Sequence, residues 1–169
     1  MKLNIQLFGG RGATSSKEAT KERAGLKSYF SRAREGLKNV AFKSGNKDVI
    51  TDSYSMYQLN KTGLEYSKNK KTTEGVKRFV KMMNEYDKQI SNYTDIKDYI
   101  TNKESYSISN DYSFNTKMIK QAKTILGKDT KVGIVYKEVG FGSNSKQQPT
   151  MILKNKKGEK GMILPQRIY

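Results

Sequence analysis

The sequence predicts an α+β fold in which a helical N-terminal two-thirds packs against a C-terminal three-stranded antiparallel meander. Apolar residues recur at helical spacing in several segments up to residue 127, and after residue 130 the apolar period changes to two. The expected helices also precede the strands without alternating with them, an order typical of α+β proteins.

The first expected helix runs from about Ser16 to Lys38. It follows the spacing Ser15-x-x-Glu18, which is typical of a capping box at a helix N-terminus. Apolar residues then recur at helical spacing. These are Leu26, Tyr29, Phe30, Ala33 and Leu37.

The middle of the chain divides into an ambiguous segment and two clearer ones. Residues 48–70 fit a short helix, but Gly63 and the many Thr and Ser residues argue for an interrupted one. An apolar stripe then predicts a core helix from Glu74 to Ile90. Thr94 with Asp95 is expected to begin another short helix.

The last third contains the final expected helix and the meander. Phe114 to Leu126 has helical spacing, and Gly127 follows where a helix commonly ends. Three strands are expected at 132–137, 151–153 and 162–164. The segment 155–158 ends in Gly and favours a tight hairpin turn between the last two strands.

The expected organisation is one folded domain with an N-terminal extension. Residues 1–16 are interpreted as a docking segment and Gly-rich hinge, because Gly9, Gly10 and Gly12 interrupt regular structure. Residues 17–169 are expected to form a single basic domain, helical over 17–127 with the meander over 131–166. A chain of 169 residues is long enough for one core of ordinary size.

The composition argues against catalysis and against a membrane protein. The chain contains neither Cys nor His, which excludes cysteine nucleophiles, Ser-His triads and zinc sites that depend on either residue. We therefore expect no enzyme activity, no cofactor and no metal. No apolar stretch approaches the roughly 18 residues of a membrane-spanning helix, so no membrane partner is expected.

The positive charge is concentrated at the two ends of the chain. The net charge is +17, with +8 in residues 1–47, 0 in residues 48–111 and +9 in residues 112–169. A basic surface of this kind is typical of proteins that bind a polyanion. The excess of Lys over Arg favours contacts with phosphate over reading of bases. A solvated, lysine-rich surface without a partner is the other explanation of this pattern.

Two sets of residues are candidates for binding. The first set, for nucleic acid or an acidic protein surface, is Lys17, Lys21, Arg23, Lys27, Arg34, Lys38, Lys137, Lys146, Lys154, Lys156 and Lys157. The second set, for docking to a protein partner, is Leu3, Ile5, Leu7, Phe8 and Arg11. The apolar members of the second set could add a strand to a sheet edge or fill a groove. Alternatively, residues 1–8 form the first strand of the domain's own sheet.

The N-terminal segment LNIQLFGGRG, residues 3–12, resembles a leader on proteins from the head-assembly gene clusters of tailed phages of Gram-positive hosts. The usual leader has Leu where this chain has Ile5. The resemblance covers under a tenth of the chain and does not extend to residues 17–169. It implies membership of a phage particle or its assembly pathway, with the leader as a portable docking tag.

Together these observations favour a noncatalytic phage accessory protein, associated with the head or portal, that binds DNA without sequence preference. Its expected location is the host cytoplasm or the virion. The alternative is a phage-encoded inhibitor of a host defence nuclease, such as an anti-CRISPR or other anti-defence protein, that acts by protein–protein binding. A small nuclease is disfavoured by the absence of His.

Overall fold

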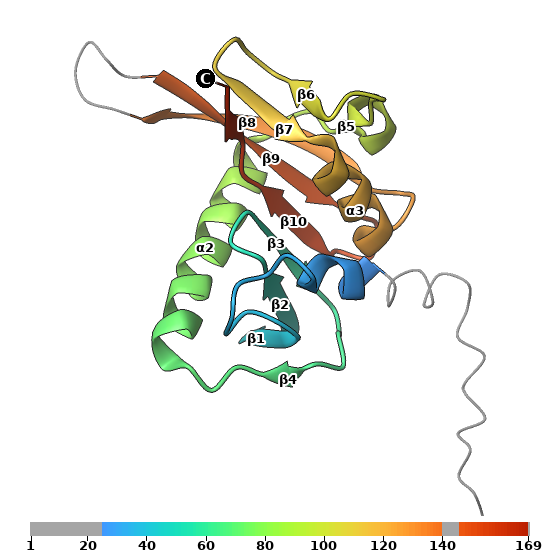
Figure 1. The fold of residues 1–169 in the computed structure, drawn as a ribbon. Coiled ribbons are helices and arrows are strands. Elements are labelled where there is room, and N and C mark those ends of the chain that lie inside the picture. The colour runs from blue at the N-terminus through green and yellow to red at the C-terminus, as the bar shows by residue number, and fades with distance from the viewer. Residues whose placement is uncertain (1–24, 140–145, 169) are drawn as a thin grey trace, which may run out of the picture.

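The molecule is built around one mixed eight-stranded sheet (Figure 1). The computed structural model describes residues 25–139 and 146–168. The strand order is β4-β1-β2-β3-β10-β9-β8-β5, and all neighbours are antiparallel except β1 and β4. The strands are β1 (Val40–Ser44), β2 (Lys47–Thr51), β3 (Ser55–Leu59), β4 (Glu65–Tyr66), β5 (Thr94–Asp95), β8 (Lys131–Val139), β9 (Lys146–Lys154) and β10 (Lys160–Ile163).

A second, smaller sheet and the helices complete the fold. The small sheet has the order β11-β7-β6. Its strands are β6 (Ser105–Ser107), β7 (Tyr112–Asn115) and β11 (Gln166–Arg167), and the helices are α2 (Lys70–Gln89), the 3-10 helix η1 (Ile96–Tyr99) and α3 (Thr116–Leu126). Residues 25–30 are also helical. No helix in the described ranges is long and apolar enough to cross a membrane.

The large sheet has an apolar core on each face, because successive side chains of a strand point to opposite sides. In β9, Met151 and Leu153 belong to one core and Ile152 to the other. β2 and β3 repeat this division, and all five residues of β3 are buried. The central strands are therefore covered on both faces.

Different elements cover the two faces (Figure 1). α2 packs on one face through the stripe Val76, Val80, Met83 and Tyr86. α3, the segment 25–37 and residues of the small sheet pack on the other face. The result is a layered molecule with one long helix on one side of the sheet and a composite layer on the other.

The predicted helical N-terminal two-thirds is wrong. Residues 40–66 form four strands, and the described structure is mostly β. The physical reason is burial on both faces: a strand covered on both sides is apolar at successive positions and loses the alternation that identifies a half-buried strand. The sequence of β3, Ser-Met-Tyr-Gln-Leu, has no alternation of this kind.

Several element boundaries also differ from prediction, and α2 begins at Lys70 and not at Glu74. The described part of the first expected helix ends at Phe30, and residues 31–39 form turns up to β1. Thr94 and Asp95 form the edge strand β5 before η1. Phe114 belongs to β7 and not to the following helix, because Asn115 caps α3.

The C-terminal strands lie where the meander was expected but belong to the larger sheet. β8, β9 and β10 form consecutive antiparallel pairs, and Gly158 closes the β9–β10 turn with a φ of 73°. β10 also pairs with β3, and β8 pairs with β5. Strands from the described chain therefore extend the expected meander on both sides, β3 along β10 and β5 along the first two residues of β8. Residues 1–8, the alternative first strand, lie outside the described residues.

Candidate nucleic-acid interface

α3 forms the centre of a basic surface. Its N-terminus is capped by the Asn115 side chain, which accepts a hydrogen bond of 2.9 Å from the backbone NH of Lys117. Gly127, with a φ of 95°, ends the helix. The buried positions Met118, Ile119, Ala122, Ile125 and Leu126 fix the inner face of α3 on the sheet. The opposite face therefore points to solvent.

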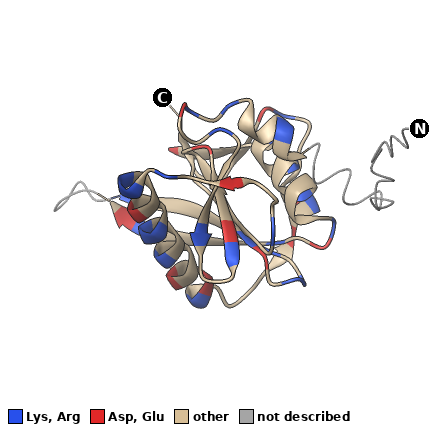
Figure 2. Cartoon of the chain, turned by 90° about the horizontal axis from the view of Figure 1, so that it is seen from below, with Lys and Arg blue, Asp and Glu red and all other residues tan. Residues whose placement is uncertain are grey.

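The solvent side of α3 carries lysines and no carboxylate. Lys117 and Lys120 are exposed and Lys123 is half-buried. None of the three forms an ion pair with another described residue. In Figure 2, α3 shows basic positions alone, whereas the longer α2 shows acidic positions among its basic ones. The charge on α3 is thus uncompensated by its own helix.

The segment 25–32 runs beside α3 and adds positive charge. A Cβ on Gly25 would lie 2.9 Å from Thr124 Cγ2, and the Arg32 guanidinium donates to the side-chain oxygen of Gln121. Lys27, between these two contacts, is exposed. The segment contains no acidic residue, so it extends the α3 surface toward the N-terminus without adding negative charge.

The β9–β10 turn borders the C-terminal end of α3. Asn155 Nδ2 donates a hydrogen bond of 2.7 Å to the carbonyl of Leu126. Lys156 and Lys157 follow in the exposed turn, and Lys128 is exposed in the loop after α3. We call Lys27, Lys117, Lys120, Lys123, Lys128, Lys156 and Lys157 the α3 basic surface. Its segments contain Asp129 and Glu159 as carboxylates.

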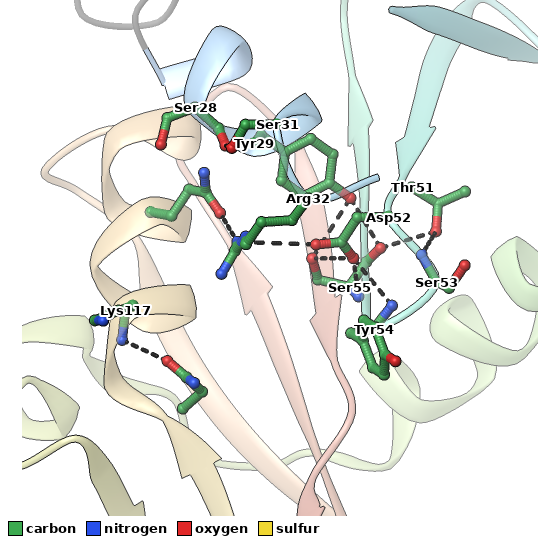
Figure 3. A network of polar contacts seen from close by, with 12 residues as sticks. Ser28, Tyr29, Ser31, Arg32, Thr51, Asp52, Ser53, Tyr54, Ser55 and Lys117 are labelled. Carbon is green, nitrogen blue, oxygen red and sulfur yellow. Dashed lines mark hydrogen bonds and ion pairs between the residues drawn. The ribbon is translucent and has the colours of Figure 1, made fainter. Parts of the chain in front are cut away.

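A buried polar network holds the segment 25–32 in place (Figure 3). The Tyr29 hydroxyl donates to the carbonyl of Ser55 at 2.9 Å, and Ser55 in turn donates to Asp52 through its backbone NH at 2.7 Å and its hydroxyl at 3.0 Å. Asp52 is 1% exposed and lies 3.8 Å from the Arg32 guanidinium. Burial, and then the nearby Asp52 carboxylate, raises the pKa of Tyr29 well above its ordinary value. Tyr29 therefore stays neutral as a hydrogen-bond donor.

The predicted binding residues are only partly brought together. Lys27, Lys156 and Lys157 lie on the α3 basic surface. Arg34 and Lys38 are exposed in the turns before β1, and Lys137 is exposed near the end of β8. Lys146, at the start of β9, forms an ion pair of 3.0 Å with Asp111. Eight predicted residues lie outside the described residues: Leu3, Ile5, Leu7, Phe8, Arg11, Lys17, Lys21 and Arg23.

Lys154 points to the α2 side of the sheet and holds the fold together. Its ammonium lies 3.2 Å from Asp87 Oδ1 and 3.7 Å from the centre of the Tyr93 ring. Lys160 contacts the same carboxylate at 2.6 Å, and the Tyr93 hydroxyl donates to it at 2.6 Å. Burial alone would raise the pKa of Asp87, but the hydrogen bonds from Lys160, Tyr93 and Lys154 lower it to about 2. Lys154 is therefore committed to a carboxylate.

Sequence reasoning missed the lysines of α3. Lys117, Lys120 and Lys123 follow one another at intervals of three, and they avoid the positions of the apolar stripe. That spacing places them along one side of a helix, so the sequence itself contains the signal. No group of three or more carboxylates suited to a metal ion occurs among residues 25–139 and 146–168.

The α3 basic surface can provide phosphate contacts. Lysine ammonium groups act as mobile point charges, which suit contacts with phosphate and do not distinguish bases.

Comparison with known proteins adds no relative: no protein-family model matches the chain, no curated protein matches it, and no solved structure matches it.

Proposed function

We propose that this protein is a noncatalytic accessory protein of a tailed phage, associated with the head or portal, that binds DNA without sequence preference through the α3 basic surface. The observation that carries the DNA-binding part is the uncompensated lysine face of α3, continuous with Lys27 on one side and with Lys156 and Lys157 on the other. The phage setting is supported by the resemblance of residues 3–12 to the head-cluster leader.

The form of the surface supports phosphate binding over a solvated surface without a partner. Its segments bring together lysines from three distant parts of the chain, and α3 itself holds no ion pair that would neutralise them within the described residues. Each lysine that neutralises a phosphate releases condensed counterions, which favours binding at low salt. The proposed interaction therefore weakens as salt rises.

A charge-matched pair of triple variants tests this proposal. Lys117→Gln, Lys120→Gln and Lys123→Gln remove three charges from α3, and Lys77→Gln, Arg78→Gln and Lys81→Gln remove three exposed charges from α2. Fluorescence anisotropy with unrelated duplex DNA at several salt concentrations measures both. We expect the α3 triple to weaken binding about tenfold or more and to lower the slope of log K against log salt by about 2.7. The α2 triple should have little effect.

Equal weakening by both triples would overturn the α3 surface as the binding site and leave only a general effect of net charge. Absence of DNA binding by the unmodified protein at low salt would overturn DNA binding altogether. A salt-tolerant stoichiometric complex with a host nuclease would instead favour the inhibitor alternative. Mass spectrometry of purified phage particles tests the setting: detection of this chain at constant copy number supports it, and consistent absence from particles and assembly intermediates contradicts it.

A further inference from the structure

An apolar pocket of about 320 Å³ lies on the α2 side of the large sheet, away from the α3 basic surface. Its apolar lining comes from the N-terminal half of α2, from β3, from β10 and from the turns before β1. The residues are Leu37, Met56, Val76, Phe79, Met162 and Leu164. This volume is at the lower end of the range for ligand pockets, and it suits a few apolar side chains.

Two polar side chains of the pocket wall, Thr51 and Ser55, already form hydrogen bonds within the described chain. Thr51 Oγ1 donates to the carbonyl of Ser55 at 2.9 Å, and Ser55 Oγ donates to Asp52 at 3.0 Å. No charged side chain lines the pocket. A polar cofactor would need convergent donors or charges to fix its orientation. The lining therefore favours an occupant with apolar side chains.

Two large apolar side chains at the pocket remain unburied by the described chain. Phe79 is 48% exposed and Tyr54 is 55% exposed, although both belong to the pocket wall. Phe79 follows Val76 on the sheet-facing side of α2, where an apolar residue is normally covered. Covering Phe79 and Tyr54 would remove apolar surface from water, which is favourable.

We propose that residues 3–8 of the same molecule dock in this pocket. Leu3, Ile5, Leu7 and Phe8 form a short apolar segment within the 24 residues that precede the described chain. The terminal strands of both sheets are short, because β4, β5 and β11 have two residues each and β6 has three, but β8 runs on past its two-residue pairing with β5 and leaves an edge for strand addition within the described residues. We favour insertion of side chains into the pocket over strand addition along β8, because insertion would also cover the apolar surface of Phe79 and Tyr54.

The connection to the pocket passes around the sheet, because Gly25 lies beside Thr124 on the α3 face and the pocket lies on the α2 face. Residues 9–24 can span up to about 50 Å when extended, and this length allows the segment to pass from one face to the other. Such a tether gives a local concentration on the order of millimolar. Docking within one molecule is therefore favoured over docking to a second copy.

Engineered cysteines in the full-length chain test the proposal, because the natural sequence has no Cys to interfere. The test pair is Phe8→Cys with Thr72→Cys, which lines the pocket. The matched control is Phe8→Cys with Glu74→Cys, which is exposed and lies about 200° around the same helix. After mild oxidation of dilute protein, non-reducing electrophoresis and mass spectrometry measure the cross-linked fraction.

We expect an intramolecular disulfide in the Thr72 pair to form at least fivefold faster than in the Glu74 pair. Adding Phe79→Glu should abolish this difference, because the new carboxylate penalises an apolar occupant. Phe79 is half-exposed, so the variant should keep its fold, and far-UV circular dichroism checks this. Equal rates in both pairs would overturn docking, and a cross-linked dimer in the Thr72 pair would overturn docking within one molecule. No nucleic acid enters the experiment, so its outcome is separate from that of the DNA-binding proposal.

Discussion

The two helices on opposite faces of the large sheet use their lysines differently. α2 has six basic and three acidic residues over Lys70–Gln89, and its Asp87 receives two lysines from neighbouring strands. α3 has three lysines and no acidic residue over Thr116–Leu126. The longer helix has more basic residues, yet only the shorter one has basic residues without acidic residues among them. A candidate surface for a polyanion is therefore identified by lysines that lack ion pairs and acidic neighbours, more than by the number of lysines.

The strongest destabilisation is expected in the two cores that support these helices. Tyr29→Ala truncates a fully buried side chain on the α3 face, and Met83→Ala does so on the α2 face. We expect Tyr29→Ala to lower the free energy of unfolding by about 3–5 kcal/mol and Met83→Ala by about 2–5 kcal/mol. Urea unfolding measures both.

The two truncations should differ in where they loosen the chain. Tyr29→Ala also removes the hydrogen bond to Ser55 that holds the segment 25–32. Hydrogen exchange should therefore accelerate in residues 25–37 for Tyr29→Ala and not for Met83→Ala. Equal acceleration of that segment in both variants would show that the two cores unfold as one unit and do not support their helices separately.

A smaller effect concerns two glycines, one beneath α3 and one within α2. A Cβ on Gly161 would lie 2.7 Å from Tyr57 Cδ1, whereas a Cβ on Gly75 of α2 would meet nothing within 4 Å. Gly161→Ala should destabilise by about 1–3 kcal/mol through overpacking. Gly75→Ala should stabilise by about 0.5–1 kcal/mol, as expected in a helix interior. Thermal unfolding that gave both changes the same sign would contradict this contrast.

The Asp87 carboxylate, which anchors α2, should make the free energy of unfolding depend on pH in acid. The pKa of Asp87 is lowered to about 2 in the folded protein, against about 3.9 in an unfolded chain. Its contribution is therefore present above pH 4 and is lost as the pH falls from about 4 to about 2. Asp87→Asn should cost about 1–2 kcal/mol at pH 7 and flatten the stability profile in that window. An unchanged profile in urea titrations from pH 2 to 5 would contradict the anchoring role.

The smallest predicted change in stability comes from the Tyr57 hydroxyl, and here the substitution should not destabilise the protein. The Tyr57 hydroxyl is buried, and it forms no hydrogen bond with another described residue. Burial also raises the pKa of Tyr57 above its ordinary range, so the group stays neutral. Tyr57→Phe removes an unsatisfied polar atom and should leave stability unchanged or raise it by up to about 1 kcal/mol. A loss of more than about 1 kcal/mol in urea unfolding would reveal a partner for this hydroxyl.

The parts of the fold that could be predicted from sequence are those with one covered face or a clear local signal. α2 has one apolar stripe, and the turn before Gly158 has the residues that such a turn requires. β1, β2 and β3 could not be identified by alternation, because each is buried on both sides. The pairing of β3 with β10 depends on contacts far apart in the sequence, which local patterns do not contain.

The candidate site was only partly predictable for a similar reason. Lys27, Lys156 and Lys157 were identifiable as basic residues near the chain ends. Their approach to α3 depends on tertiary contacts such as that between Asn155 and Leu126. Lys154 lies in the same basic segment of the sequence as Lys156, yet its ammonium forms an ion pair with Asp87 on the α2 side of the sheet. Composition therefore indicated a basic surface but not its members.

The pairing of β3 with β10 has a consequence for synthesis of the chain. These strands are central neighbours in the sheet, yet about 100 residues separate them along the chain. On the ribosome, β3 can pair with β2 early, but its other edge must wait until residue 163 has emerged. Nascent chains with an open apolar edge are prone to aggregate, so chaperone demand should peak just before β10 is made.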